Sequence, residues 1–164
     1  KLQDLLFALN KIKKENKTDI PILLKVSPDI KDNCVPEIVD VAIKNDISGI
    51  ILTNTTNSNR DNLASEIKKE EGGLSGEPIQ QISTNMIKKF YKKLNGKIPI
   101  IGVGGINSGK SAYEKIIAGA SLLQLYTGLV YKGPSVAKEI KKELIQILKD
   151  EGINNIKDAI GKGV

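Results

Sequence analysis

The sequence contains no histidine and no tryptophan, and Cys34 is its single cysteine. The missing histidines remove the commonest general base and metal ligand, so we expect no metal site. One cysteine cannot form an internal disulfide framework or a zinc site of several thiolates, and it fits a reducing compartment. No apolar run approaches the about 18 residues of a membrane span, and the lysine-rich, amphipathic start does not have the form of a signal peptide.

Arginine is nearly absent as well. Arg60 is the only one, so 24 of the 25 basic residues are lysine, and the net charge is +6. The lysines stand in short groups at the polar positions of amphipathic segments. A nucleic-acid-binding surface would more often combine arginine with stacking aromatic residues, which make up only 4% of this chain. We therefore assign the lysines to solvated helix faces and expect no nucleic-acid partner.

The 164 residues, of which 40% are apolar, suffice for one domain with a substantial core. Short runs of Ile, Leu and Val alternate with amphipathic segments. Strands are expected at 22–27, 47–54, 98–103 and 120–126, and helices at 2–14, 34–45, 78–94, 109–118 and from Gly133 to Gly152. Apolar strands that alternate with helices indicate a parallel sheet covered by helices.

Two architectures fit this alternation, an open doubly wound sheet and a (β/α)8 barrel. A barrel typically needs about 250 residues, so four βα units would be half of one. The strand at 22–27 places Leu23, Lys25 and Ser27 on one face. We expect Lys25 to be buried without a route to bulk water, and Gln124 is a milder case. Polar groups near strand ends favour the barrel, whose active site lies at the carboxyl rim, and make Lys25 a candidate functional residue.

A polar segment follows the second strand. It begins with Thr53-Asn54-Thr55-Thr56, whose side chains can both donate and accept hydrogen bonds. About 20 mostly polar residues then end in the GGLSG sequence at 72–76. Loops of this length in compact domains are usually functional lids or disordered segments. The glycines alone are equally compatible with plain turns and with close approach to a ligand.

The stretch GVGGINSGKS, residues 102–111, contains the letters of a P-loop from Gly104 onward. A true P-loop also needs an acidic residue that holds magnesium at the end of another strand. The nearest acid, Asp29, follows Pro28 in a loop instead. The dinucleotide fingerprint fails too, because Asn107 stands where it requires glycine.

A phosphate site of the barrel type remains. Such sites use backbone N–H groups from the loops after the last two strands and from the start of a short extra helix. Gly104-Gly105 and Tyr126-Thr127-Gly128 fit that arrangement, and Lys110 is then incidental.

Six motifs, taken in order and spacing, closely resemble the C-terminal half of dihydroorotate dehydrogenases. They are VSPD (26–29), TNTT (53–56), GGLSGEP (72–78), IPIIGVGGINSG (98–109), AGASLLQLYTGLVYKGP (118–134) and DAIG (158–161). Tyr126 and the Gly-Pro pair after it are similar to the class 2, membrane-associated and quinone-reducing branch. The resemblance covers essentially the whole chain.

This resemblance implies FMN as cofactor and oxidation of dihydroorotate to orotate in pyrimidine biosynthesis, with a quinone as electron acceptor. The implied FMN contacts are Lys25, near flavin N1 and O2, Thr53 and Gly76 along the flavin, and Gly105, Tyr126 and Thr127 at its phosphate. Asn54 and Thr55 would bind the orotate. An ammonium near N1 is physically reasonable, because negative charge develops there when the flavin is reduced.

The resemblance also implies an α/β fold in which residues 1–164 supply about the last four βα units of one FMN-binding (β/α)8 TIM barrel, with no second domain. The first strand would then be an open edge. The catalytic base, a serine in class 2 enzymes, is expected in the first half of the barrel, outside this sequence. We therefore assign no catalytic residue here and do not promote Ser27, Ser75, Ser108 or Cys34 to that role.

A segment outside this sequence would also form the quinone tunnel and attach the enzyme peripherally to the bacterial or mitochondrial inner membrane. The chain alone is then expected to be inactive. Three alternatives stay open at this point: another FMN- or phosphate-binding TIM-barrel oxidoreductase, a P-loop nucleotide-binding protein, and a half-barrel that only binds a partner.

Overall fold

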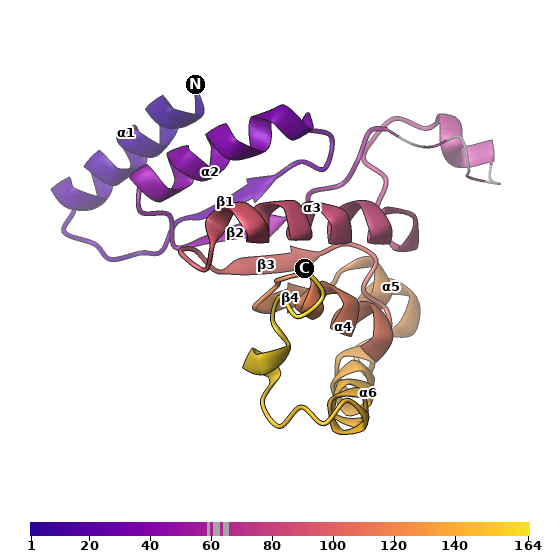
Figure 1. Ribbon diagram of the computed structural model, residues 1–164. Helices are drawn as coiled ribbons and strands as arrows, with labels where there is room; N and C mark the ends of the chain where they lie inside the picture. The colour runs from indigo at the N-terminus through magenta and orange to yellow at the C-terminus, as the bar shows by residue number, and fades with distance from the viewer. Residues whose placement is uncertain (59, 61–62, 64–65) are drawn as a thin grey trace.

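The computed structural model describes residues 1–58, 60, 63 and 66–164 (Figure 1). Its helices are α1 (Leu2–Glu15), α2 (Val35–Lys44), α3 (Gln80–Leu94), α4 (Gly109–Ile117), α5 (Thr127–Lys132) and α6 (Val136–Asp150). Its strands are β1 (Leu23–Val26), β2 (Gly49–Leu52), β3 (Ile100–Val103) and β4 (Leu122–Gln124). Four single 3-10 turns complete it: η1 (Asp32–Cys34), η2 (Glu66–Lys69), η3 (Glu77–Ile79) and η4 (Ile156–Ala159).

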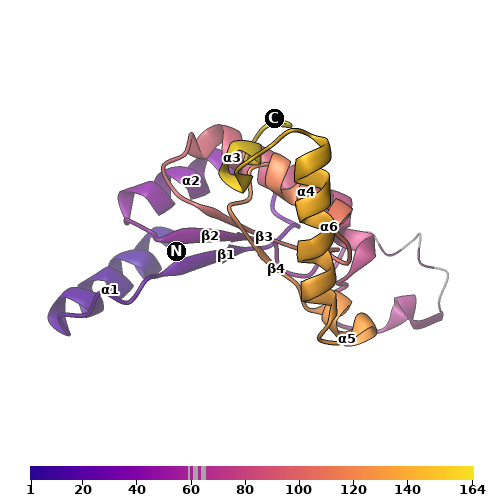
Figure 2. The ribbon, with the colours of Figure 1, turned by 90° about the horizontal axis from the view of Figure 1, so that it is seen from below.

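The four strands form one parallel sheet in the order β1-β2-β3-β4. In the register of the sheet, Lys25 lies beside Ile51, Ile51 beside Ile101, and Val103 beside Gln124. A doubly wound sheet reverses its strand order at a switch point, whereas this sheet keeps sequence order throughout. The α/β fold is thus a run of four consecutive βα units, the arrangement of a sector of a (β/α)8 barrel (Figures 1 and 2).

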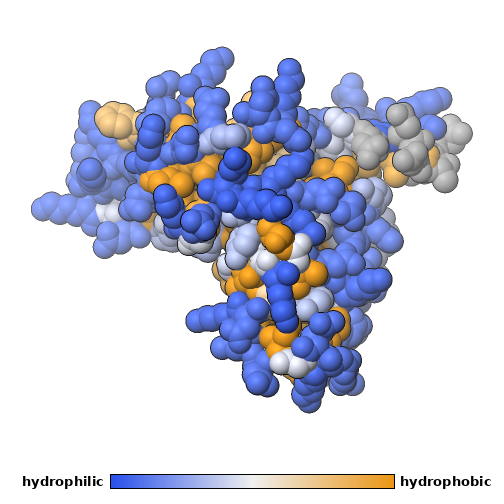
Figure 3. Space-filling model, viewed as in Figure 1, coloured by the Kyte–Doolittle hydropathy of each residue, from blue (hydrophilic) through white to orange (hydrophobic). Residues whose placement is uncertain are grey.

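The helices bury one face of the sheet. Alternation along the strands turns Val26, Ile50 and Ile100 toward α2 and α3, where they join one core with Phe90 and Ile87. A second core lies between α4, α6 and the C-terminal segment, and it contains Ile106, Ala112, Ile116, Val136, Ile140, Leu144, Ile153 and Ala159. Hydrophilic side chains cover most of the helix surface in Figure 3, with apolar residues between the helices.

The opposite face of the sheet is open among the described residues. Leu23 and Leu122, on the two edge strands, are 44% and 62% exposed. Lys25 and Gln124 are exposed on the same face. The expectation that Lys25 is buried without a route to water is therefore wrong for this chain. The strand alternation was correct, but only one of the two faces is covered.

The elements occur where the sequence predicts them, with differences at their ends. Each strand is two to four residues shorter than expected, because the ends of the apolar runs lie beyond the paired part of the sheet. Helix α5 was not expected as a separate element. It is six residues long and ends at Gly133, whose φ is 74°. No helix among the described residues is long and apolar enough to cross a membrane.

Candidate functional site

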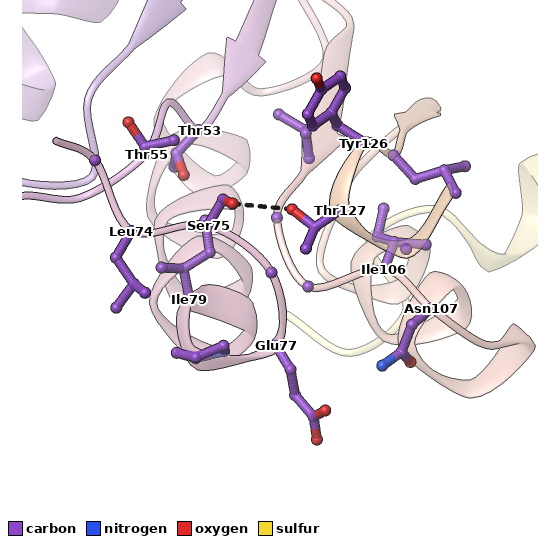
Figure 4. A pocket seen from close by; sticks show the side chains of 18 of the residues that line it. Thr53, Thr55, Leu74, Ser75, Glu77, Ile79, Ile106, Asn107, Tyr126 and Thr127 are labelled. Carbon is purple, nitrogen blue, oxygen red and sulfur yellow. Dashed lines mark hydrogen bonds between the residues drawn. The ribbon is translucent and has the colours of Figure 1, made fainter. Parts of the chain in front are cut away.

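A cleft of about 870 Å³ lies at the carboxyl ends of the four strands (Figure 4). Its size falls within the about 300–1,000 Å³ that is usual for small-molecule and cofactor sites. All eight residues that the sequence singled out line it: Lys25, Thr53, Asn54, Thr55, Gly76, Gly105, Tyr126 and Thr127. They come from all four βα units, so the fold brings together positions about 100 residues apart in the chain. Their assigned roles stay predictions.

The segment after β2 orients its own side chains. Thr53 is buried, and its hydroxyl donates to the carbonyl oxygen of Asn54 at 2.9 Å. The Oδ1 atom of Asn54 accepts from the backbone N–H of Thr55, also at 2.9 Å. Asn54 lines the cleft, and its side-chain NH2 group remains available as a donor. This end of the cleft is suited to an acceptor such as a carboxylate or a carbonyl.

Asp29, in the turn after β1, fixes the same segment. Its carboxylate accepts from the hydroxyl of Thr56 and, at 2.9 Å, from the backbone N–H of Asn57. Thr56 is buried and also pairs with Leu74 in an isolated antiparallel bridge. The sequence drew attention to Asp29 as a poor magnesium ligand and as the last residue of the VSPD motif, without a role of its own. Its positioning role escaped prediction, because nothing in the local sequence indicates a contact 27 residues along the chain.

The glycine-rich segment 72–76 crosses the cleft toward the start of α5. Ser75 Oγ lies 2.9 Å from Thr127 Oγ1, the contact drawn in Figure 4. Gly76 has a φ of 82°, and a Cβ atom there would lie 2.9 Å from Thr127 Cγ2. Glycine is therefore needed at 76 for both its backbone conformation and its close approach to Thr127. Residues 59, 61–62 and 64–65 of the long loop expected before this segment lie outside the described residues.

The turn after β3 contains two further glycines with positive φ, Gly104 at 118° and Gly105 at 73°. In the described part of the chain, their backbone N–H groups have no hydrogen-bond acceptor, and neither do those of Thr127 and Gly128 at the start of α5. The two turns touch, since a Cβ atom on Gly128 would lie 2.6 Å from the carbonyl oxygen of Ile106. Adjacent free N–H groups of this kind form a concave site for an anion.

The P-loop interpretation fails at the start of α4. The backbone N–H of Gly109 donates to Glu143 Oε2, so a carboxylate occupies the position that a P-loop gives to phosphate. Ser108 and Ser111 form a capping box on the same turn. Lys110 is exposed on the outer side of the helix and is not among the residues that line the cleft. Glu143 lies 34 residues away, so the local pattern could not reveal this contact.

Tyr126 and Lys132 lie at the rim of the cleft. The Tyr126 side chain is 76% exposed, while its backbone forms the N-cap of α5. Lys132, which sequence analysis did not select, donates from Nζ to the carbonyl oxygen of Asn107 at 2.8 Å. This contact ties α5 to the turn after β3. Lys132 lines the same cleft as the free N–H groups of both turns.

FMN fits the groups that line this cleft. The free N–H groups and the ammonium of Lys132 suit a phosphate at one end, and Lys25 provides a cation at the ends of β1 and β2. No group of three potential metal ligands occurs among the described residues. None of the three serines considered in the sequence is poised as a base. Ser27 Oγ accepts from the Asp29 N–H, Ser75 pairs with Thr127, and Ser108 caps α4.

Comparison with known proteins agrees with the family resemblance of the sequence motifs. The sequence model of the family described as "Dihydroorotate dehydrogenase" matches residues 1–148. A protein of Trichodesmium erythraeum named dihydroorotate dehydrogenase (quinone) is 44% identical over 161 residues, which are 93% of this chain and 42% of that protein. The mitochondrial dihydroorotate dehydrogenase (quinone) of Mus musculus is 47% identical over 140 residues, 85% of this chain and 35% of that protein.

Solved structures give the same result. A crystal structure of the dihydroorotate dehydrogenase of Eimeria tenella in complex with ferulenol matches with a TM-score of 0.83 at 44% identity. The match covers 87% of this chain and 38% of that one. The chain thus spans about two fifths of the length of these relatives.

Proposed function

Because this chain belongs to the dihydroorotate dehydrogenase family, we propose that it forms the FMN cleft and part of the substrate site of an enzyme that oxidises dihydroorotate to orotate with a quinone as electron acceptor. The observation that carries this proposal is the single cleft at the carboxyl ends of β1–β4. It gathers all eight residues to which the family resemblance assigns a role. FMN, when bound, would supply the hydride-accepting and electron-transferring chemistry that no side chain provides.

We place the FMN phosphate on the two turns that touch at Gly128 and Ile106. The N–H groups of Gly105 and Thr127 would donate to it, and Tyr126 would hold its position through the N-cap of α5. Binding by backbone dipoles needs no rearrangement, because the conformations of Gly104 and Gly105 are already fixed by packing against the first turn of α3.

We assign the isoalloxazine ring to the part of the cleft between Lys25 and Gly76. Lys25 lies on the open face of the sheet, where its ammonium would stabilise negative charge at one edge of the ring. Thr53 is already hydrogen-bonded to the Asn54 carbonyl, so it would contribute packing and shape rather than a free hydroxyl.

Asn54 and Thr55 would bind the substrate. The amide of Asn54 is oriented by its bond from the Thr55 N–H and can donate to a carboxylate or ring carbonyl of dihydroorotate. The oxidation also requires removal of a proton, a step that the family resemblance assigns to a serine outside this sequence. We therefore place the base, together with the quinone channel and the membrane contact, in a part of the enzyme outside this chain.

The test compares ligands that differ only at the phosphate. The holoenzyme is stripped of flavin, and the dissociation constants of FMN and riboflavin are measured by fluorescence. FMN should bind more tightly than riboflavin by about 10²-fold or more, the effect of several charge-assisted hydrogen bonds. Asn54→Ala should leave both affinities unchanged and raise the KM for dihydroorotate in a quinone-linked assay. Equal affinity for the two flavins, or tight binding of magnesium–ATP, would contradict the assignment.

A second assay tests whether residues 1–164 alone catalyse the reaction. Residues 1–164 alone should not turn over dihydroorotate, since general-base help typically contributes about 10²–10⁴ in rate. Quinone reduction by this chain alone at ordinary enzyme rates would place a base within it.

A further inference from the structure

Lys115, in the last turn of α4, is fully buried. Its relative accessibility is 0%, and it is the only lysine among the buried residues that the structure describes. The Nζ atom donates to the carbonyl oxygen of Gln80 at 2.7 Å and to Thr84 Oγ1 at 2.6 Å. None of the ion pairs within 4 Å in the described part of the chain includes it. A buried ammonium without a carboxylate is costly, so its position calls for a physical explanation.

Both acceptors belong to the first turns of α3. Gln80 is the first residue of that helix, and Thr84 Oγ1 donates in turn to the Gln80 carbonyl at 2.9 Å. The side chain of Gln80 also reaches α4, where its Nε2 donates to Glu114 Oε2 at 2.8 Å. Lys115 thus binds the main-chain carbonyl of Gln80, and the adjacent Glu114 binds its side chain.

Gln80 is packed directly against the glycine turn. A Cβ atom on Gly105 would lie 2.4 Å from Gln80 Cβ and 2.7 Å from Gln80 Cα. On Gly104 it would lie 3.1 Å from Ser83 Cβ, and Ser83 Oγ donates to the Val103 carbonyl oxygen at 2.6 Å. No side chain separates the turn from the helix, so a displacement of Gln80 would displace Gly105.

We propose that Lys115 is a positioning residue for the phosphate end of the cleft, and that it acts by fixing the first turn of α3 against Gly104-Gly105. This inference rests on the proposed function, which places a phosphate on that turn. The turn lies between β3 and α4, and Lys115 links α4 back to the helix on which the turn is packed. With this link intact, the N–H groups of the turn keep one direction before any ligand arrives. Lys115 itself contacts neither cofactor nor substrate.

The charge of Lys115 agrees with this geometry. Burial lowers its pKa to about 8, and the nearby Glu114 opposes that change. The ammonium form therefore predominates at pH 7, and it makes stronger hydrogen bonds to the Gln80 carbonyl and the Thr84 hydroxyl than a neutral amine would.

The test uses the flavin-free holoenzyme and compares Lys115→Met, which keeps the length of the side chain but removes its donor, with Lys110→Met on the exposed side of α4. We expect Lys115→Met to weaken FMN binding about 10–100-fold and riboflavin binding less than about threefold, because only the phosphate depends on the turn. Lys110→Met should change neither affinity.

If Lys115→Met does not fold, Thr84→Val provides the test, since it removes one acceptor of the Lys115 ammonium and keeps the shape of the side chain. It should produce a smaller loss in the same direction, about 3–10-fold for FMN with riboflavin unchanged. A folded variant whose ratio of FMN to riboflavin affinity equals that of the parent would overturn the inference, even if its melting temperature fell. A parent enzyme that fails to discriminate the two flavins would instead overturn the phosphate site itself.

Discussion

The side-chain oxygens of Ser75 and Thr127 lie 2.9 Å apart, and this contact joins the loop after β2 to the first residue of α5. It closes the cleft across its width, between the segment that would face the flavin ring and the helix start that would bind its phosphate. The close approach of Gly76 to Thr127 Cγ2 supports the same junction. The cleft is therefore built from loops that lie far apart in sequence.

Removal of this contact should loosen one wall of the cleft. Ser75→Ala deletes the hydroxyl and leaves Thr127 in place to bind a ligand. We expect FMN affinity to fall about 3–10-fold, the net effect of one neutral hydrogen bond, with little change in thermal stability. Flavin fluorescence titration measures the affinity. Ser121→Ala, at an exposed serine before β4, is the matched control and should have no effect. An unchanged affinity in Ser75→Ala would show that the junction does not shape the flavin site.

Gly105 should be far less tolerant of a side chain than a glycine with the same backbone conformation in open space. Gly105→Ala would place a methyl group within 2.4 Å of Gln80 Cβ at a φ of 73°. Gly152, with a φ of 66°, has no atom within 4 Å of the corresponding position. Gly152→Ala should therefore cost about 1–2 kcal/mol of unfolding free energy from backbone strain alone, and Gly105→Ala clearly more.

Urea unfolding of the two variants measures both costs. The loss of unfolding free energy in Gly105→Ala beyond that in Gly152→Ala measures the cost of the contact with α3. Gly105→Ala should also lose FMN binding. Equal costs for the two variants would mean that the first turn of α3 yields easily to the new methyl group. The proposed role of Lys115 would then lose its mechanical basis.

The pattern of apolar residues was sufficient to predict much of the fold. The four expected strands and five expected helices all occur where periodicity places them, because burial of one face imposes that periodicity. The exposure of Lys25 could not be predicted, since the strand pattern shows that a residue shares a face with Leu23 but not what covers that face. The letters GGINSGKS left a P-loop open as an alternative for a related reason. What decides the chemistry there is Glu143, a long-range contact.

Lys115 should make stability depend on pH. Its pKa is about 8 in the folded protein and near 10.5 in an unfolded chain. Between these values the unfolded chain binds more protons at this position, so the contribution of Lys115 to the unfolding free energy rises with pH. The slope is at most about 1.4 kcal/mol per pH unit for one proton. Lys115→Met has no group to titrate, so the stability of the parent relative to this variant should increase from pH 7 to pH 10.

Urea unfolding of both proteins at each pH gives that difference, in which the titration of the surface lysines cancels. A difference that stays constant from pH 7 to pH 10 would mean that Lys115 keeps its ordinary pKa. A difference that decreases would mean that the ammonium is stabilised by a partner in the folded protein.

Lys25 provides the most direct test of the proposed chemistry. It lies on the open face of β1 and lines the cleft beside Thr53 and Asn54, where the ring of FMN would lie. In the holoenzyme, Lys25→Ala should slow flavin reduction by dihydroorotate and lower the flavin reduction potential, because negative charge on the reduced ring loses its cation. Loss of one preorganised electrostatic partner typically costs about 2.7–4 kcal/mol in the transition state, or roughly 10²–10³ in rate. Lys97→Ala, at an exposed lysine before the amino end of β3, is the control and should leave both quantities unchanged.

Stopped-flow reduction of the FMN-loaded variant separates this role from a structural one. A structural lysine would lower the melting temperature on removal and leave the rate of flavin reduction intact in the folded fraction. The exposure of Lys25 in this chain makes a large loss of stability unexpected, since an exposed side chain contributes few packing contacts that its removal could disrupt. A decrease in rate and potential without a decrease in stability would assign the ammonium to the flavin. A normal reduction rate would remove Lys25 from the site and leave the electrostatics of the ring end to residues outside this chain.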